Sequence, residues 1–360
     1  MNHKLIKLLL LFVVLCPAGV WAQAQSAPFT SREFVALIYQ LPKHPELRDE
    51  VVEEIRKRGI GFPLTEGMRS LVATKSGSDP LLRRTLEEAE RRRVNPAASA
   101  RPPEAEANDL LDRTRVATLA AADAMPDFIV KQLIKRSVAY GTTSNWLPQD
   151  NLTIAVGYRA TSGEQYKVLA INGVPRGADA KESRDYSKEV GGATSTGVEY
   201  ISAVADVFRT ESKTEFKLAD TDLIQGRRTL VFEYQIEVPF SKLNLKAGEA
   251  TANVGSRGRI WIDRETNRVL RFEQVATEIP GNFPITAASS VIDYDWVTIG
   301  EQKFLLPTHT EILLTNATGR MVVQSRNDIR FRGYQKFGAE LKVIDEIDEK
   351  DFPPDVPEKP

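Results

Sequence analysis

Residues 228–238, with the sequence RTLVFEYQIEV, constrain the fold more than any other stretch of the chain. Successive side chains of a β-strand point to opposite faces, and apolar residues occupy every second position here. The pattern predicts a strand with one apolar and one polar face, and such a strand requires a sheet whose apolar face is covered. The apolar positions are Leu230, Phe232, Tyr234, Ile236 and Val238.

Residues 259–273, with the sequence RIWIDRETNRVLRFE, predict a hairpin of the same kind. Further strands are predicted from the same alternation, and 290–298 places Ile292 and Tyr294 on one face with Asp293 and Asp295 on the other. The apolar face of the hairpin is expected to contain Ile260, Ile262, Leu270 and Phe272. The other predicted strands are 128–139, 152–158, 165–171, 303–314 and 321–331.

Nine or more antiparallel strands, each with one wet face and one dry face, must close on themselves or pack on helices. The apolar periodicities of 109–124 and 196–208 predict two helices that are candidates for this cover. Thr196 and Glu199 are expected to form a capping box for the second. The predicted fold class is therefore α+β, with a small helical module followed by a curved antiparallel half-barrel sheet covered by helices.

The first 24 residues predict a signal peptide. Lys4 and Lys7 precede an apolar run from 8 to 16, and Ala22-Gln23-Ala24 is a small-x-small cleavage site. The apolar run is shorter than the roughly 20 residues that span a bilayer, and no later run reaches that length. We therefore expect an exported, periplasmic or extracellular protein that is cleaved near Ala24 and has no transmembrane segment in its mature chain.

The remaining chain divides into four parts. Residues 29–93 predict a helical module, with caps at Thr30, Thr65 and Asp79. Residues 94–108 are rich in Pro and Ala and predict a linker. The half-barrel domain is expected over 109–343, followed by a disordered acidic, Pro-rich tail over 344–360.

The charge balance excludes one class of partner. Lys+Arg number 48 and Asp+Glu 49, so no strong field favours nucleic acid. Arg91, Arg92 and Arg93 follow acidic residues and predict a solvated helix end. The single cysteine, Cys16, lies in the signal peptide, so neither disulfides nor thiolate metal sites are expected.

Two pairs of side chains that contain carboxylates are candidates for chemical sites. His309 and Glu311 share a predicted strand face and could form a metal corner or a general base with its partner. Asp293 and Asp295 could act as paired carboxylates or bind a hard cation. For both pairs a solvent-facing strand surface is the favoured interpretation, and no catalytic residue, metal site or cofactor is assigned.

The apolar strand faces are the stronger candidates for a functional site. They could line a cavity for an acyl chain or form a packed core, and residue type alone does not distinguish the two. The candidate ligand-lining residues are Leu230, Phe232, Tyr234, Ile260, Ile262, Leu270, Phe272, Ile292 and Tyr294.

Residues 56–93 resemble a small helical module found before other domains in bacterial proteins. The larger domain resembles a family of secreted, uncharacterised proteins common in acidobacteria. The hairpin IWIDRETNRVLRFE is also similar to one in the periplasmic lipoprotein-sorting carriers of the LolA and RseB type. That similarity implies a half-open barrel whose concave apolar face holds acyl chains, and it implies no catalytic residues. The stretches that match the acidobacterial family are 125–136, 226–243, 258–285, 290–307 and 326–337.

These observations predict an exported, non-enzymatic protein that binds or senses an apolar ligand or a lipidated partner in the cell envelope. An acyl chain or a lipoprotein is the expected ligand, and the helical module is a candidate surface for an envelope protein partner. The alternative is a protein–protein interaction or scaffold protein with a solid sheet core and no cavity. An enzyme would require His309, Asp293 or a glutamate to lie in a cleft with a second polar group.

Overall fold

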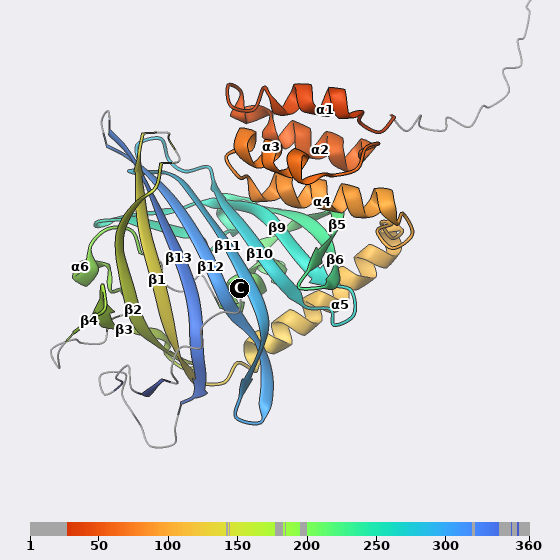
Figure 1. Ribbon diagram of the computed structural model, residues 1–360. Coiled ribbons are helices and arrows are strands. Elements are labelled where there is room, and N and C mark those ends of the chain that lie inside the picture. Colours follow the sequence, from red (N-terminus) through yellow and green to blue (C-terminus); the bar gives the residue numbers. More distant parts are fainter. Residues whose placement is uncertain are drawn as a thin grey trace, which may run out of the picture.

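The computed structural model describes residues 27–141, 143, 145–176, 183, 185–194, 200–318, 321–337, 347, 351 and 352. The predicted signal peptide and the predicted capping box at Thr196 and Glu199 lie outside these residues. Most of the predicted tail lies outside them as well. The described residues form an α+β fold in which N-terminal helices precede a large curved antiparallel sheet that does not close (Figure 1).

The N-terminal helices form a module with a hydrophobic core of its own, which includes Phe34, Ile55 and Leu82. The capping box of Thr30 and Glu33 is confirmed, because each side chain bonds the other residue's backbone N–H. The caps at Thr65 and Asp79 are also confirmed. The elements are α1 (Ser31–Ile38), the 3-10 turn η1 (Pro45–Leu47), α2 (Arg48–Arg58), α3 (Glu66–Ser76) and α4 (Pro80–Val94).

The main sheet has eleven strands among the described residues, in the order β4-β3-β2-β1-β13-β12-β11-β10-β9-β6-β5. A separate two-stranded hairpin pairs β7 with β8. The strands are β1 (Phe128–Tyr140), β2 (Leu147–Arg159), β3 (Gly163–Ile171), β4 (Val174–Pro175), β5 (Glu215–Ile224), β6 (Arg227–Ile236), β7 (Asn244–Ala247), β8 (Ala250–Asn253), β9 (Gly255–Asp263), β10 (Val269–Thr277), β11 (Ile285–Ile299), β12 (Gln302–Thr318) and β13 (Met321–Lys336).

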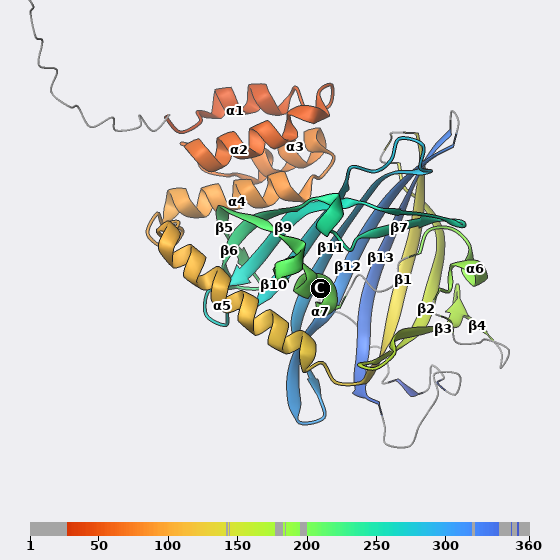
Figure 2. The ribbon, with the colours of Figure 1, turned by 180° about the vertical axis from the view of Figure 1, so that it is seen from behind.

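Two helices cover the concave face of the sheet (Figure 2). Helix α5 (Glu104–Asp123) contributes Leu110 and Leu111, and α7 (Ile201–Phe208) contributes Val204 and Phe208, to a single core with the strands. The two predicted cover helices are thus present. Short helical segments connect the strands elsewhere: α6 (Ser187–Val190), η2 (Thr210–Ser212) and η3 (Val238–Phe240).

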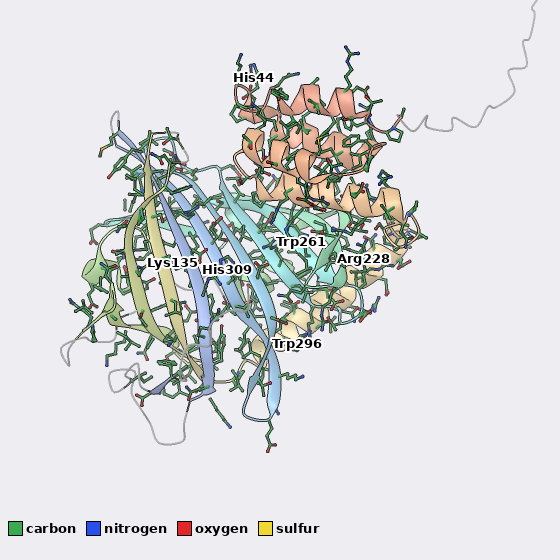
Figure 3. All side chains as sticks on the ribbon, viewed as in Figure 1. His44, Lys135, Arg228, Trp261, Trp296 and His309 are labelled. Atoms are coloured by element: carbon green, nitrogen blue, oxygen red, sulfur yellow. The ribbon has the colours of Figure 1, made fainter. Side chains whose placement is uncertain are left out.

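The convex face is also covered over part of its width, so the prediction of one wet face for each strand is wrong there. Val231 on β6 and Trp261 on β9 point away from the concave core and are only 3% and 1% exposed. Helix α4 packs across the convex face at β5, and Figure 3 shows Trp261 and Arg228 beneath the helical module. The sequence pattern alone does not report this long-range cover.

Buried ion pairs join the helical module to the convex face. Glu88 on α4 is 1% exposed and accepts hydrogen bonds from Arg228 at 2.7 Å and from the Thr221 hydroxyl at 2.5 Å. The prediction of a solvated helix end is therefore wrong for two of its three arginines. Arg91 pairs with Asp222 at 2.7 Å, and Arg92 pairs with Asp220 at 2.5 Å.

The segment predicted as a linker is held in the same interface. Helix α5 begins at Glu104, five residues inside the predicted range. The carbonyl of Ser99 accepts a hydrogen bond from the Thr221 hydroxyl at 3.3 Å, and Arg101 lies 3.5 Å from Asp220. Two tail residues are also packed, since Ile347 and Phe352 are buried against Ala155 and Leu169. The prediction of a disordered tail does not hold at these two positions.

Replacing Glu88 with alanine is expected to lower the free energy of unfolding by about 3–5 kcal/mol, because Arg228 loses its buried carboxylate partner. Urea-induced unfolding measures the change. Glu87→Ala is the matched control on the same helix, since Glu87 pairs with Arg69 inside the module and is partly exposed. Its effect is expected to stay near 1 kcal/mol or below. Equal effects of the two substitutions would contradict the buried network.

Candidate ligand cavity

The nine predicted ligand-lining residues all lie in the concave core beneath α5 and α7. Each is at most 3% exposed, and all belong to one hydrophobic cluster. Tyr234 shows how closed this region is. Its hydroxyl lies 3.3 Å from the Ser256 hydroxyl, and burial raises the pKa of Tyr234 above its ordinary value.

A cavity of about 910 Å³ lies beside this core on the same face of the sheet. None of the nine predicted residues lines it. Its walls come from β10 to β13, from the ends of β1 and β2, from the β7–β8 hairpin and from the segment around α6. The lining residues used below are Val138, Asp185, Lys188, Gly192, Leu245, Lys246, Glu249, Gln274, Ile285, Ala288, Ser290, Ile312 and Leu314.

The strand register explains where the core ends and the cavity begins. Ile292, Phe272 and Ile260 are neighbours across β11, β10 and β9. Two residues further along each strand, the next row on the same face contains Ser290, Gln274 and Gly258. The large side chains of the first row pack against the cover helices. The second row has smaller side chains at its two ends, and the cavity begins at this row.

A signal for the cavity is present in the sequence. Residues 286–290 read TAASS and interrupt the large apolar pattern of β11 with small side chains. Ala288 lines the cavity and pairs with Leu314 on β12. A search for small residues at inward-facing positions would have located this region, whereas a search for large apolar residues selects the packed core instead.

Two elements border the mouth of the cavity, and they approach each other across the concave face in Figure 2. The cover hairpin, β7–β8, contributes Leu245 to a hydrophobic cluster with Phe283, which precedes β11, and with Ile285 and Ala288 on β11. The α6 wall, residues 185–194, lies opposite, over β1 and β2. Residues of both elements line the cavity above its apolar floor.

A buried arginine fixes the α6 wall. Arg136 on β1 is 2% exposed and forms a two-point ion pair with Asp150, at 2.6 and 2.5 Å. It also donates to the Gly191 carbonyl at 2.5 Å, and Asn327 donates to the Ala193 carbonyl at 3.0 Å. These contacts attach the wall to β1 and β13.

One ion pair joins the two borders of the mouth. Lys246 of the cover hairpin lies 2.9 Å from Asp185 of the α6 wall. Hydrogen bonds from Ser187 and Lys246 lower the pKa of Asp185 to about 2, and the same pair raises the pKa of Lys246. The pair is therefore fully charged at neutral pH.

The other predicted polar candidates lie on the convex face, where Figure 3 shows His309. His309 does not pair with Glu311 but contacts the neighbouring strands, with Asp328 at 3.1 Å and Asp293 at 3.7 Å. Asp293 also forms a two-point ion pair with Arg271 at 2.7 Å. Asp295 accepts a hydrogen bond from the Trp296 backbone instead of sharing a site with Asp293.

The structure contains no group of three or more His, Cys, Asp or Glu side chains placed to hold a metal ion in the part of the chain that it describes. Within the same residues, none of the helices is long and apolar enough to cross a membrane.

No family model and no curated protein matches the chain. Several solved structures show a distant similarity, and three of them serve as examples. They are a DUF1329 family protein from Desulfovibrio piger (10% identity, 65% of this chain and 94% of that chain, TM-score 0.31), a LolA superfamily protein from Nitrosomonas europaea (11%, 62% and 93%, 0.26) and the MucA/MucB complex of Pseudomonas aeruginosa (9%, 61% and 94%, 0.16). Similarities with TM-scores this low do not assign a function.

The His309 contacts predict a specific pH dependence of stability. Hydrogen bonds to Asp293 and Asp328 raise the pKa of His309 from 6.5 to about 9. The folded state therefore binds this proton more tightly than the unfolded state. The resulting stabilisation is complete below pH 6.5 and is lost as the pH rises through about 9.

The test compares wild type with His309→Gln by urea-induced unfolding across this pH range. The wild type is expected to be the more stable protein at low pH, with the difference shrinking as the imidazolium loses its proton. A difference that stays constant across the range would show that the charged His309 contacts do not stabilise the fold.

Proposed function

We propose that this chain is an exported, non-enzymatic protein that binds an acyl-bearing molecule, such as a lipid or the lipidated end of a partner, in the cavity beneath the cover hairpin. The observation that carries the proposal is the cavity itself. Its volume of about 910 Å³ lies within the roughly 300–1,000 Å³ range of small-molecule sites.

The lining suits a ligand with one apolar and one polar end. Ile285, Ile312 and Leu314 form an apolar floor, whereas Lys188 and Lys246 lie among the lining residues of the α6 wall and the cover hairpin. An acyl chain placed on this floor would bury its methylene groups at about 0.8 kcal/mol each. The predicted signal peptide would direct the protein to the cell envelope, where such ligands occur.

The helical module remains a candidate surface for an envelope partner, but only part of its surface is open to such a partner. Its α4 already packs on the sheet, so a partner would have to meet the faces left by α1 and α3. Tyr39, at the C-terminal end of α1, is 54% exposed and lies under the Lys75 ammonium group.

Native mass spectrometry of protein purified from the envelope without detergent, before and after solvent extraction, tests the proposal. A bound acyl species that is lost on extraction and taken up again on incubation is expected. A bare mass with no uptake would favour the scaffold alternative, in which the sheet is purely a core.

Ala288→Phe is expected to reduce acyl-ligand uptake by at least about tenfold, equivalent to about 1.4 kcal/mol, because the ring occupies the cavity. Ala287→Phe is the matched control, since Ala287 is the neighbouring position on β11 and is exposed outside the cavity lining. Retained uptake in a folded Ala288→Phe protein, confirmed by circular dichroism, would show that the ligand binds elsewhere.

A further inference from the structure

The two borders of the cavity mouth are attached to the protein in different ways. The α6 wall is fixed by Arg136 and Asn327, and Ser183, which precedes it, exchanges two backbone hydrogen bonds of 2.8 Å with Tyr166 on β3. The cover hairpin belongs to a two-stranded sheet of its own. Its base is held near Leu243 and Val254, whose backbones are joined by a 3.0 Å hydrogen bond.

Across the mouth, the described part of the hairpin makes one ion pair, between Lys246 and Asp185. Underneath, Leu245 rests on Ile285 and Ala288, which are cavity-lining residues. An acyl chain that enters the cavity would replace these apolar contacts with equivalent ones. Contacts with the acyl chain can thus replace the apolar contacts of Leu245, and the underside of the hairpin stays shielded from water.

The two partners in the ion pair differ in what they retain if it opens. Asp185 keeps a 3.0 Å hydrogen bond from the Ser187 backbone N–H, and about a third of its side chain is exposed. Lys246 has Asp185 as its ion-pair partner among the described residues, and its side chain is 52% exposed. A second anion at the mouth could therefore replace Asp185 with little loss to the carboxylate.

We propose that Lys246 is the headgroup site of the cavity and that its ligand is an anionic amphiphile. The headgroup replaces Asp185 as the ion-pair partner of the Lys246 ammonium group, and the chain enters the cavity beneath Leu245. This inference rests on the proposed function and adds the charge of the ligand to it. The exchange also breaks the ion pair between the cover hairpin and the α6 wall. The mouth therefore opens as the ligand binds. An acyl carboxylate and a lipid phosphate share the required chemistry.

The experiment compares three probes with the same chain and different headgroups: dodecanoate, dodecan-1-ol and dodecyltrimethylammonium. Isothermal titration calorimetry below their micelle concentrations gives each affinity. Wild type is expected to bind dodecanoate about five- to tenfold more tightly than dodecan-1-ol, and the cation least. Lysophosphatidic acid with the same chain distinguishes the phosphate from the carboxylate as the preferred headgroup.

Lys246→Met is expected to remove the preference for dodecanoate over dodecan-1-ol, because neither headgroup then meets a charged partner at this position. Asp185→Asn is expected to raise the affinity for dodecanoate several-fold, because the competing anion is gone. The matched controls are Lys242→Met and Asp206→Asn. That pair is separated by 3.0 Å, has nearly the same exposure and lies outside the cavity lining, so neither substitution should change any affinity.

The outcomes separate this inference from the function on which it rests. Equal affinities of the three probes for wild type, or a preference for dodecanoate that survives in Lys246→Met, would overturn the headgroup assignment and leave acyl binding intact. Loss of the preference in Lys188→Met alone would also overturn it, because the headgroup would then bind the other lysine. Binding of none of the probes would overturn the proposed function and this inference together.

Discussion

The apolar concave face of a wide, open sheet must be kept from water, and the rest of the structure follows from how that face is covered. Helices α5 and α7 pack on the part where Phe272 and Ile292 provide large side chains. They do not cover the part where Ala288 and Ser290 provide small ones. The cover hairpin lies over this second part, and the space beneath it is the cavity.

The convex face differs from the concave face, because charged groups are buried there. Glu88, Asp220 and Asp222 are each at most 4% exposed, and each pairs with arginine across the boundary between the helical module and the sheet. Buried charges without partners are strongly destabilising, so these pairs specify one docking arrangement. They attach the helical module to the convex side of β5 and β6.

Much of the fold could be predicted from the chain alone, because alternation in strands and caps on helices are local signals. The strand β5 could not, since Asp220 and Asp222 break its apolar pattern and their arginine partners lie about 130 residues earlier. The nine predicted ligand-lining residues lie on the face of the sheet that contains the cavity, but they belong to the packed core beside it. Side-chain volume decides between core and cavity, and the small residues at 286–290 carry the relevant signal.

Photo-crosslinking with a diazirine-labelled fatty acid, followed by peptide mass spectrometry, tests the central claim that the ligand binds under the cover hairpin. The account predicts labels on the hairpin around Leu245 and on the cavity strands around Ala288 and Leu314, with competition by unlabelled fatty acid. Labels confined to the outer face of the helical module, or labels that competitor does not reduce, would contradict it.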